Sequence, residues 1–297
     1  MNLNDIKKEI IEKHPQFKES KFRENINGWS NYVVVVDDEY IFRITRDEYS
    51  AKMLEIEKMI LPFFRGKFEI EIPNFEYVSD KKSIYNYVGY KLIKGKELSK
   101  EILESLSNEE YKTIAKSVAD FLSSLHSIDI ISSRIDMENI SNRNNEWVRF
   151  KDNVLEKSNK VLDKKEKSWI SNIFDEFNRE LSKEDLKTSF LHGDFTDDHI
   201  LVNNKNNVSG IIDFGDLCIG DTAFDFAGIY SSYGKEFMEL VISNYKCDVD
   251  ANFRKRIEQF YIKQIPLHEL LCGVESSNKG QIENAIKRIR ETMKSDN

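Results

Sequence analysis

One short stretch of the sequence holds residue types that could carry out phosphoryl transfer. H-G-D at 192–194 is followed by His199, and D-F-G at 213–215 comes after two short apolar segments. Phosphoryl transfer needs a carboxylate that orients and deprotonates the acceptor hydroxyl, and ligands that hold Mg²⁺ against the nucleotide phosphates. The spacing therefore predicts Asp194 as the catalytic residue and His199 with Asp213 as the metal ligands.

A β-hairpin is expected to bring these three side chains together. The apolar runs 200–202 and 210–212 flank a polar turn at 206–207, which is the pattern of a hairpin. Asp194 precedes the hairpin, His199 is expected to begin its first strand, and Asp213 follows its second strand. Either Asp alone also fits a residue that caps a strand end. The combination with His199 favours the catalytic interpretation.

This segment resembles the catalytic core of the antibiotic kinases, which share the protein-kinase-like fold. The run G-I-I-D-F-G-D, followed by Gly220-Asp221 and Asp225-Phe226, is most similar to the aminoglycoside 2″-phosphotransferases, with the macrolide phosphotransferases next. Most of the superfamily has Asn where this chain has His199, a substitution that the 2″ group shares. Imidazole is a softer ligand than an amide or carboxylate oxygen, so His199 is expected to be the weaker metal ligand. The resemblance gives Asp225 a structural role in bracing the catalytic loop.

The resemblance implies an α+β, bilobal protein-kinase-like fold. A small antiparallel β-sheet with a helix forms the N-terminal lobe, and the larger C-terminal lobe is mainly helical. Gly95 marks the change between them. Residues 1–94 are therefore expected to form the nucleotide-binding lobe that ends in the hinge, and residues 95–297 the lobe with the catalytic loop and substrate pocket.

Apolar periodicity and breaker residues predict the individual elements. Strands are expected from Phe22 onwards and at 32–36, 40–44, 72–78 and 83–93. Helices are expected at 3–14, 48–61, 99–106, 109–127, 145–161, 164–181, 234–245, 252–273 and 279–294.

Two regions of the N-terminal lobe are expected to hold the phosphates. The loop at 25–31 can fold over them and offer backbone N–H groups, with Gly28 and Ser30 as its contact residues. Arg43 stands where a kinase keeps its phosphate-contacting Lys, and guanidinium can bind phosphate bidentately. Glu57 falls where the family's helix carboxylate pairs with that cation. The alternatives are an outward-facing strand cation for Arg43 and a solvated helix face for Glu57.

The hinge is expected at the end of segment 83–93. The resemblance implies that the backbone of Lys91 and Ile93 binds the edge of the base. Tyr90 stands at the gatekeeper position, where a bulky Tyr resembles the members that prefer GTP; a core aromatic of a half-buried strand is the alternative. The expected phosphoryl donor is GTP or ATP with Mg²⁺.

The resemblance implies an aminoglycoside as acceptor, and hence antibiotic resistance as the outcome. Its ammonium groups would need converging carboxylates. The candidates are acidic residues of the C-terminal lobe: Asp197, Asp198, Asp216, Glu269 and Glu275. The aromatic residues Tyr230, Tyr233 and Tyr261 could line the less acidic pocket that a macrolide would tolerate. The chain departs from the 2″ pattern at 231–232, where Ser-Ser replaces an acidic pair, and at His268, near where another acid is expected.

Two other functions stay open. A macrolide 2′-phosphotransferase, or another small-molecule kinase, would tolerate the less acidic pocket. A pseudokinase that binds nucleotide without transferring phosphate is the non-enzymatic alternative, and it is motivated by the non-standard residues Arg43 and His199.

Composition limits the partners. The net charge of −8 argues against nucleic acid, which favours a basic face, and is compatible with a cationic substrate. The three cysteines show no ligand spacing and are expected to be reduced thiols of a cytoplasmic protein. Charged residues near the N-terminus indicate that no signal peptide precedes the chain. No apolar run approaches membrane-spanning length, and a monomer is expected.

Overall fold

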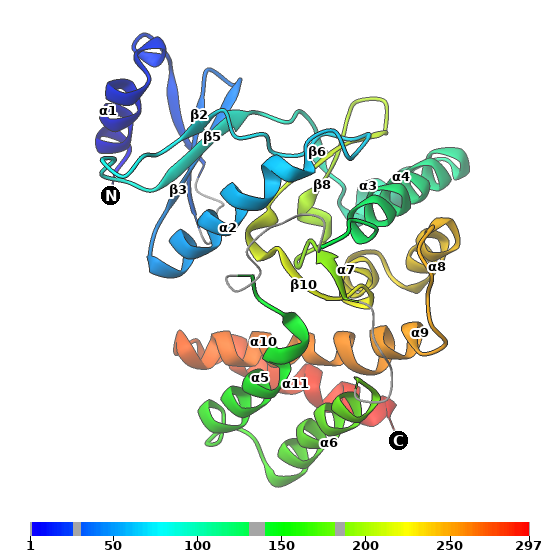
Figure 1. The fold of residues 1–297 in the computed structure, drawn as a ribbon. Coiled ribbons are helices and arrows are strands. Elements are labelled where there is room, and N and C mark those ends of the chain that lie inside the picture. Colours follow the sequence, from blue (N-terminus) through cyan, green and yellow to red (C-terminus); the bar gives the residue numbers. More distant parts are fainter. Residues whose placement is uncertain (1, 26–30, 131–139, 182–187, 297) are drawn as a thin grey trace.

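The computed structural model describes residues 2–25, 31–130, 140–181 and 188–296. Its N-terminal part is a five-stranded antiparallel sheet with the order β1-β2-β3-β5-β4 (Figure 1). Helix α1 (Leu3–Lys13) covers one face of the sheet, and helix α2 (Glu48–Phe64) follows β3 on the other side. The strands are β1 (Phe22–Asn25), β2 (Asn31–Val36), β3 (Tyr40–Thr45), β4 (Tyr77–Val78) and β5 (Tyr87–Lys91).

Strand register decides which side chains face the C-terminal part. Val33 lies opposite Arg43, and Ile41 lies opposite Tyr90. Directly opposed residues share a face of a sheet, and alternate residues along a strand do as well. The face of the sheet that is turned towards α2 and the C-terminal part therefore carries Arg43 and Tyr90. The other face packs on α1 and is apolar: Val34, Val36, Phe42 and Ile44 meet Ile6, Ile10 and Phe17.

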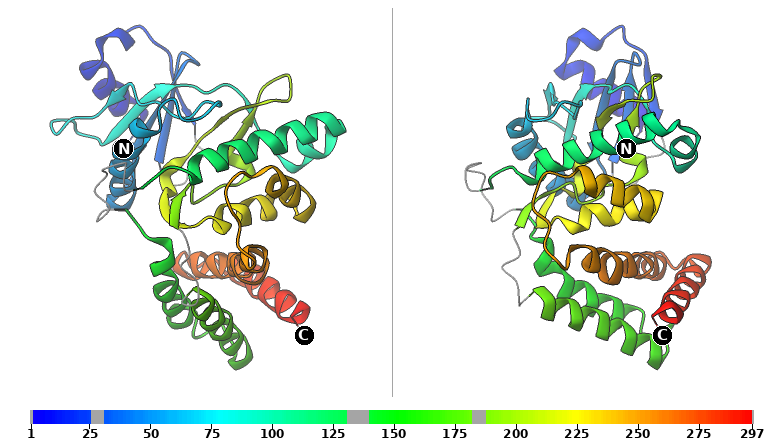
Figure 2. Two further views of the ribbon diagram at one scale, coloured as in Figure 1. Left: turned by 45° about the vertical axis from the view of Figure 1, so that its right-hand side comes forward. Right: turned by 90° about the vertical axis from the view of Figure 1, so that its right-hand side faces the viewer.

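The C-terminal part is mainly helical and has one large apolar core. Two small sheets lie where it meets the N-terminal part: β6 (Lys96–Glu97), β8 (Ile200–Val202) and β9 (Val208–Ile211) form one, and β7 (Thr188–Leu191) pairs with β10 (Cys218–Asp221). In both views of Figure 2 the sheet and α1 form one end of the molecule and α5, α6, α10 and α11 the other. The helices are α3 (Lys100–Ser105), α4 (Asn108–His126), α5 (Arg143–Lys157), α6 (Lys164–Leu181), α7 (Ala223–Tyr233), α8 (Lys235–Asn244), α9 (Phe253–Arg256), α10 (Ile262–Glu275) and α11 (Lys279–Ser295).

Helix α4 shows how the sequence builds the support beneath the site. Ser107 caps its first turn and Glu110 completes a capping box, so the free N–H groups are satisfied. Its stripe of apolar residues is fully buried: Ile114, Val118, Leu122 and Leu125. The helix lies against β7 and β9, the strands that precede the segments of Asp194 and Asp213. The packing of α4 against β9 thereby holds the hairpin in position.

Several elements differ from the predicted ones. The predicted strand 72–78 is reduced to β4, and nearby Glu71 forms a parallel bridge with Gly210, its carbonyl accepting from the N–H of Ile211 at 2.9 Å. The predicted helix 252–273 is divided by a π-helix at Ile257–Tyr261. Pro266 lies one turn later and cannot donate to the carbonyl of Ile262, which removes one α-helical hydrogen bond there. No helix of the described residues has both the length and the apolar character needed to cross a membrane.

Candidate active site

The catalytic loop is fixed in place by a buried carboxylate. Asp225, at the start of α7, accepts hydrogen bonds from the backbone N–H groups of His192 (2.9 Å) and Gly193 (3.0 Å). His126 of α4 also donates to it at 3.0 Å. Burial alone would raise the pKa of Asp225, but the hydrogen bond from His126 and the other groups around it hold the pKa below its ordinary value. An ionised Asp225 thus ties two helices to the loop.

Glycine is required within this loop. Gly193 has φ of +86°, and a Cβ there would lie 2.0 Å from the carbonyl oxygen of Asp216. Any side chain would therefore clash with backbone. The H-G-D and D-F-G-D segments can pass this close to each other only because position 193 has no side chain.

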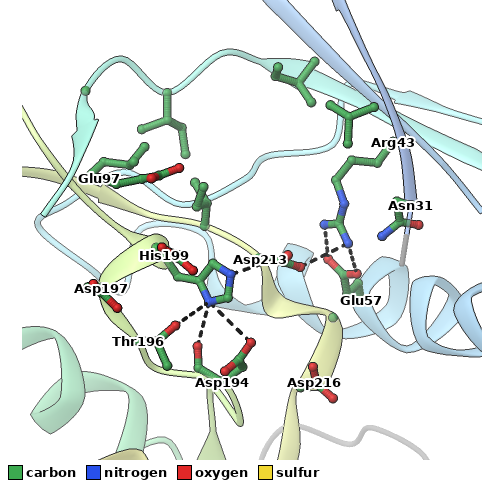
Figure 3. A pocket seen from close by; sticks show the side chains of 18 of the residues that line it. Asn31, Arg43, Glu57, Glu97, Asp194, Thr196, Asp197, His199, Asp213 and Asp216 are labelled. Carbon is green, nitrogen blue, oxygen red and sulfur yellow. Dashed lines mark hydrogen bonds and ion pairs between the residues drawn. The ribbon is translucent and has the colours of Figure 1, made fainter. Parts of the chain in front are cut away.

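Three predicted residues converge at the bottom of the cleft between the two parts of the molecule (Figure 3). Nδ1 of His199 lies 3.7 Å from the carboxylate of Asp194, and its Nε2 lies 3.7 Å from the carboxylate of Asp213. The prediction that His199 begins the first hairpin strand is wrong. Residues Asp197–His199 form a 3₁₀ turn, because the N–H of His199 donates to Thr196 and the N–H of Ile200 to Asp197. The strand begins at Ile200.

The surroundings of His199 set its tautomer. Nδ1 lies 2.7 Å from the backbone carbonyl of Asp194, which can only accept, so the proton of a neutral imidazole is on Nδ1. Nε2 then directs a lone pair towards Asp213. An imidazole that is oriented through its other nitrogen is the usual form of a histidine metal ligand.

The donor set fits a divalent cation that is shared with a nucleotide. Asp213 and His199 supply two donors. Among the described residues, His, Cys, Asp and Glu form no cluster of three that could hold a metal ion. Mg²⁺ commonly takes one or two protein ligands and fills its other positions with phosphate oxygens and water. The two residues are therefore suited to Mg²⁺ bound together with phosphates.

The two carboxylates beside His199 have pKa values shifted in opposite directions. Burial raises the pKa of Asp194, with His199 opposing it. Burial would also raise the pKa of Asp213, but Arg43, 3.5 Å away, and His199 hold it below its ordinary value. Asp213 therefore stays ionised, as a metal ligand would need to be, while Asp194 binds a proton more readily. Such divergent environments separate a proton acceptor from an electrostatic partner.

The backbone at Asp213 is held in an uncommon conformation. Its φ is +61°, in the left-handed region that residues other than glycine rarely adopt. Such strain persists where the surrounding structure enforces it, and it occurs often at functional sites. Here it directs the side chain of Asp213 towards Arg43 and His199 (Figure 3).

Arg43 and Glu57 form a buried, bidentate ion pair. Nη1 and Nη2 of Arg43 each donate to one carboxylate oxygen of Glu57 at 2.8 Å, and the residues are 6% and 1% exposed. The expected pairing is present, and neither residue has the exposed position of the alternative. Tyr90 lies beside the pair: burial raises the pKa of Tyr90 to about 12, and the positive charge of Arg43 opposes the shift.

Most of the predicted site residues line one cavity of about 1290 Å³ between the two parts of the molecule, hereafter the cleft. They are Arg43, Glu57, Tyr90, Ile93, Asp194, Asp197, Asp198, His199, Asp213 and Asp216. Gly28 and Ser30 lie outside the described residues.

The structure does not bring every candidate to the cleft. Glu269 pairs with Arg288 of α11, and Glu275 pairs with Lys157 at 2.6 Å, so both carboxylates are engaged elsewhere. Tyr230 packs against the core. Lys91 has an exposed side chain at the end of β5 and is not among the lining residues.

The hydroxyls of two other tyrosine candidates are also engaged. Tyr233 donates to the carbonyl of Leu98 at 2.7 Å, and Tyr261 donates to Asp221 at 2.9 Å. Both residues are buried.

Some lining residues are not among the predicted site residues. The sequence pattern marks Ser232 only as the replacement of an acid, but its hydroxyl donates to the carboxylate of Asp197 at 2.9 Å and accepts from the N–H of Asp197 at 3.1 Å. Glu97, just past the hinge, adds a carboxylate (Figure 3). Its position after Gly95 was the signal that could have found it. Asn31 and Tyr49 of the N-terminal part also line the cleft.

Acidic side chains dominate the C-terminal wall of the cleft. Arg43 pairs with Glu57 and lies 3.5 Å from Asp213, which leaves one negative charge in this group of three. Lys96 is a further cation of the lining. The carboxylates that remain are Glu97, Asp194, Asp197, Asp198 and Asp216. Burial raises the pKa of Asp216 against the opposing charge of Arg143. This wall is suited to a cationic ligand.

Comparisons with known proteins agree with this geometry. A sequence model of the phosphotransferase enzyme family (APH) matches residues 21–261. The GDP and kanamycin complex of APH(2″)-IIIa superposes with a TM-score of 0.86 at 21% identity, covering 98% of this chain and 99% of that chain. Macrolide 2′-phosphotransferase type I superposes with a TM-score of 0.71 at 18% identity, covering 96% of both chains. The uncharacterized protein YcbJ of Bacillus subtilis (strain 168) is 22% identical over 236 residues, which are 74% of this chain and 73% of YcbJ. The predicted kinase-like fold is confirmed.

Proposed function

The chain belongs to the phosphotransferase enzyme family, and from this premise we propose that it transfers the γ-phosphoryl group of GTP or ATP to a hydroxyl of an aminoglycoside. The observation that carries the proposal is the convergence of Asp194, His199 and Asp213 beside Arg43. Residues 1–94 would form the nucleotide lobe and residues 95–297 the lobe that holds the acceptor. The enzyme would act as a cytoplasmic monomer and make its host resistant.

Each residue has a role that its surroundings support. Asp194 orients the acceptor hydroxyl and accepts its proton, for which a raised pKa is favourable. The acceptor oxygen forms a bond to the γ-phosphorus, and the bond from that phosphorus to the β-phosphate oxygen breaks. Arg43, held by Glu57, provides positive charge next to the phosphates. Mg²⁺, bound through Asp213 and His199, would neutralise and polarise phosphate oxygens.

The donor would enter with its base at the hinge. Ile41, Leu92 and Ile93 give an apolar surface there. Lys91 and Ile93 would contact the base through their backbone. Tyr90 is 6% exposed and narrows the inner end of the cleft, which supports GTP as the preferred donor.

The acidic wall supports a cationic acceptor. Asp197 and Asp198 face the cleft beside Asp194, and Ser232 holds Asp197 in position. Asp216 and Glu97 would add further charge. Tyr230 and Glu269 would contribute less to binding of the acceptor, because neither is among the residues that line the cleft. The Ser-Ser pair at 231–232, where the 2″ group has acids, favours the macrolide alternative.

A phosphorylation panel tests the proposal. The purified protein is incubated with Mg²⁺, GTP or ATP, and kanamycin, gentamicin, streptomycin or a macrolide, and the products are identified by mass. Phosphorylated aminoglycoside from the wild type but not from Asp194→Asn is the expected result. If only a macrolide is phosphorylated, the acceptor is a macrolide and not an aminoglycoside. Nucleotide binding without transfer to any compound would instead support the pseudokinase.

A further inference from the structure

Tyr245 follows α8 and reaches the residues that brace the catalytic loop. Its hydroxyl oxygen lies 2.7 Å from Nδ1 of His126, whose Nε2 lies 3.0 Å from the carboxylate of Asp225. Asp225 in turn accepts from the N–H groups of His192 and Gly193. Tyr245 is not among the described residues that line the cleft. This series of hydrogen bonds, hereafter the relay, therefore links a side chain outside the cleft to the backbone of the H-G-D segment.

The proton positions in the relay follow from what each atom can do. The pKa of Asp225 lies below its ordinary value, so its carboxylate is ionised and can only accept. The proton between Asp225 and His126 is therefore on Nε2. In a neutral imidazole Nδ1 is then a bare acceptor that needs a donor. His126 is only 3% exposed, so bulk water does not supply that donor, and the hydroxyl of Tyr245 is the group in its place.

The structure around Tyr245 fixes its position. The ring packs edge-on against that of Phe226, with the ring centroids 5.0 Å apart. The N–H of the next residue, Lys246, donates to the hydroxyl of Ser123 at 2.9 Å, and Ser123 precedes His126 by about one turn of α4. The segment after α8 is thus attached to the helix that carries the imidazole.

The hydroxyl of Tyr245 has its proton available for His126. Burial is the main cause that raises the pKa of Tyr245, and side-chain hydrogen bonds with Cys247 and Thr222 shift the pKa in opposite directions. The hydroxyl is therefore protonated. A thiol is a weak acceptor, and the hydroxyl of Thr222 can itself donate to the phenol oxygen. The imidazole Nδ1 is thus the best acceptor for the phenol proton.

We propose that Tyr245 is a positioning residue whose hydroxyl donates to Nδ1 of His126 and thereby holds the imidazole in the tautomer that donates from Nε2 to Asp225. The inference rests on the proposed function, because it concerns the loop that carries Asp194. With the proton on Nδ1 instead, His126 would direct a lone pair at an ionised carboxylate, and the two groups would repel each other. Asp225 would then rotate and release the two N–H groups of the H-G-D segment. Because Asp194 belongs to that segment, its alignment with the acceptor hydroxyl depends on the tautomer of His126.

Nuclear magnetic resonance of Tyr245→Phe tests the tautomer and the loop. This substitution removes the donor and keeps the packed ring. Protonated and bare imidazole nitrogens have distinct ¹⁵N resonances, and His126→Gln assigns the signals because it removes them. Above the ordinary pKa of histidine, the wild type is expected to show a protonated Nε2 and a bare Nδ1 at His126, and Tyr245→Phe a mixture of tautomers. The backbone N–H groups of His192 and Gly193 should also exchange with solvent faster in Tyr245→Phe.

Steady-state kinetics distinguishes positioning from binding. In Tyr245→Phe the kcat of transfer is expected to fall roughly 5- to 10-fold, because Asp194 is aligned for a smaller fraction of the time. KM for GTP should stay unchanged, since the nucleotide is expected to contact Arg43 and the hinge, which lie outside the relay. Rates are measured well below the melting temperature of each variant, so that unfolding does not account for a lower kcat.

Tyr87→Phe is the matched control. The hydroxyl of Tyr87 likewise lies 3.0 Å from Nε2 of a histidine, His14, but Tyr87 packs in the apolar cluster beneath α1. This variant should keep the wild-type kcat and the wild-type amide exchange of the loop. His126→Gln is a second background, because its side-chain NH₂ can donate to Asp225 without a partner at Nδ1. Tyr245→Phe should cause no further loss of kcat when it is added to His126→Gln.

Several results would overturn the inference. They are a wild-type kcat in Tyr245→Phe, a wild-type His126 that is protonated on Nδ1, an equal loss of kcat in Tyr87→Phe, or an equal loss from Tyr245→Phe with and without His126→Gln. A wild type that binds GTP but phosphorylates no acceptor would refute the transfer. The tautomer and the amide exchange would then decide the role of Tyr245, and unchanged exchange in Tyr245→Phe would refute it.

Discussion

The imidazole of His199 donates its Nδ1 proton to the backbone carbonyl of Asp194, 2.7 Å away. The loop that holds Asp194 thereby orients the proposed metal ligand His199. Nε2 is left free to face Asp213, so a cation bound there would be connected to this loop through His199. A change at either residue is therefore expected to affect both the cation and the acceptor.

His199→Asn tests this coupling. Asn restores an oxygen ligand, which Mg²⁺ prefers, so the variant should keep activity and reach half-maximal rate at lower Mg²⁺ concentration. His199→Ala should need roughly 10- to 100-fold more Mg²⁺. The measurement is the rate as a function of free Mg²⁺. Identical Mg²⁺ curves for all three proteins would place the cation elsewhere.

Asp194→Asn is expected to lower the rate of transfer while it raises the thermal stability of the protein. Transfer is expected to fall by roughly 10²–10⁴, because the proton acceptor is lost, while GTP binding is kept. The raised pKa of Asp194 means that its charged form is disfavoured in the folded state, so removing the charge should raise Tm at neutral pH. A lower Tm in a thermal melt, or near wild-type transfer, would contradict this role.

The pH dependence of kcat/KM should report Asp194. Its pKa is raised by burial and transfer requires the unprotonated form, so activity is lost as pH falls through that raised value. Asp213 has a lowered pKa and stays ionised over the same range. The acid limb should therefore lie above the ordinary aspartate value of about 3.9. Asp175→Asn on α6, which removes an exposed carboxylate that pairs with Lys151, is the control, and its limb should keep the wild-type position.

Glu57→Ala should be strongly destabilising. It leaves the Arg43 guanidinium buried without its bidentate partner, at a cost of about 3–5 kcal/mol in the free energy of unfolding. Glu55→Ala on the same helix removes an exposed carboxylate that pairs with Lys58, and should cost about 0–1 kcal/mol. Urea unfolding of both variants checks the contrast. Equal losses would mean that burial of the pair is unimportant.

Two substitutions at Tyr90 distinguish its bulk from its hydroxyl. Tyr90→Ala should improve the use of ATP relative to GTP, because it removes the ring that narrows the cleft. Tyr90→Phe keeps the ring but removes the hydroxyl that interacts with the charge of Arg43, so KM should change by a similar factor for both nucleotides and leave their ratio nearly unchanged. Steady-state kinetics with each donor gives both values. An unchanged ratio in Tyr90→Ala would end the proposed steric role.

Local sequence patterns were sufficient for the parts of the site that depend on short-range order. The hairpin turn, the D-F-G segment and the strand of Arg43 are visible in the order of apolar and polar residues, whereas the pairing of Glu57 with Arg43 is implied by the family resemblance. These side chains meet because one hairpin and one strand–helix pair position them.

Tertiary partners were not predictable in the same way. The hydrogen bond between Ser232 and Asp197 and the ion pair of Glu269 with Arg288 join residues on different elements, and no local pattern indicates them. The two-residue strands β4 and β6 are too short for alternation to be visible. The π-helix in the predicted helix 252–273 has apolar spacing that resembles an ordinary helix.

The bridge between Glu71 and Gly210 has a mechanical consequence. Besides the covalent hinge, it joins the two parts of the molecule through backbone hydrogen bonds, and it lies close to Ile93 because a Cβ on Gly210 would meet both Ile93 and Glu71. The covalent hinge and the bridge are two neighbouring connections, and together they define one axis about which the two parts could rotate. Rotation about that axis would have to separate α2 from the C-terminal core, in which Leu54, Ile60 and Phe64 pack, and from the turn Phe214–Asp216. The bridge and this helix together thus fix the width of the cleft.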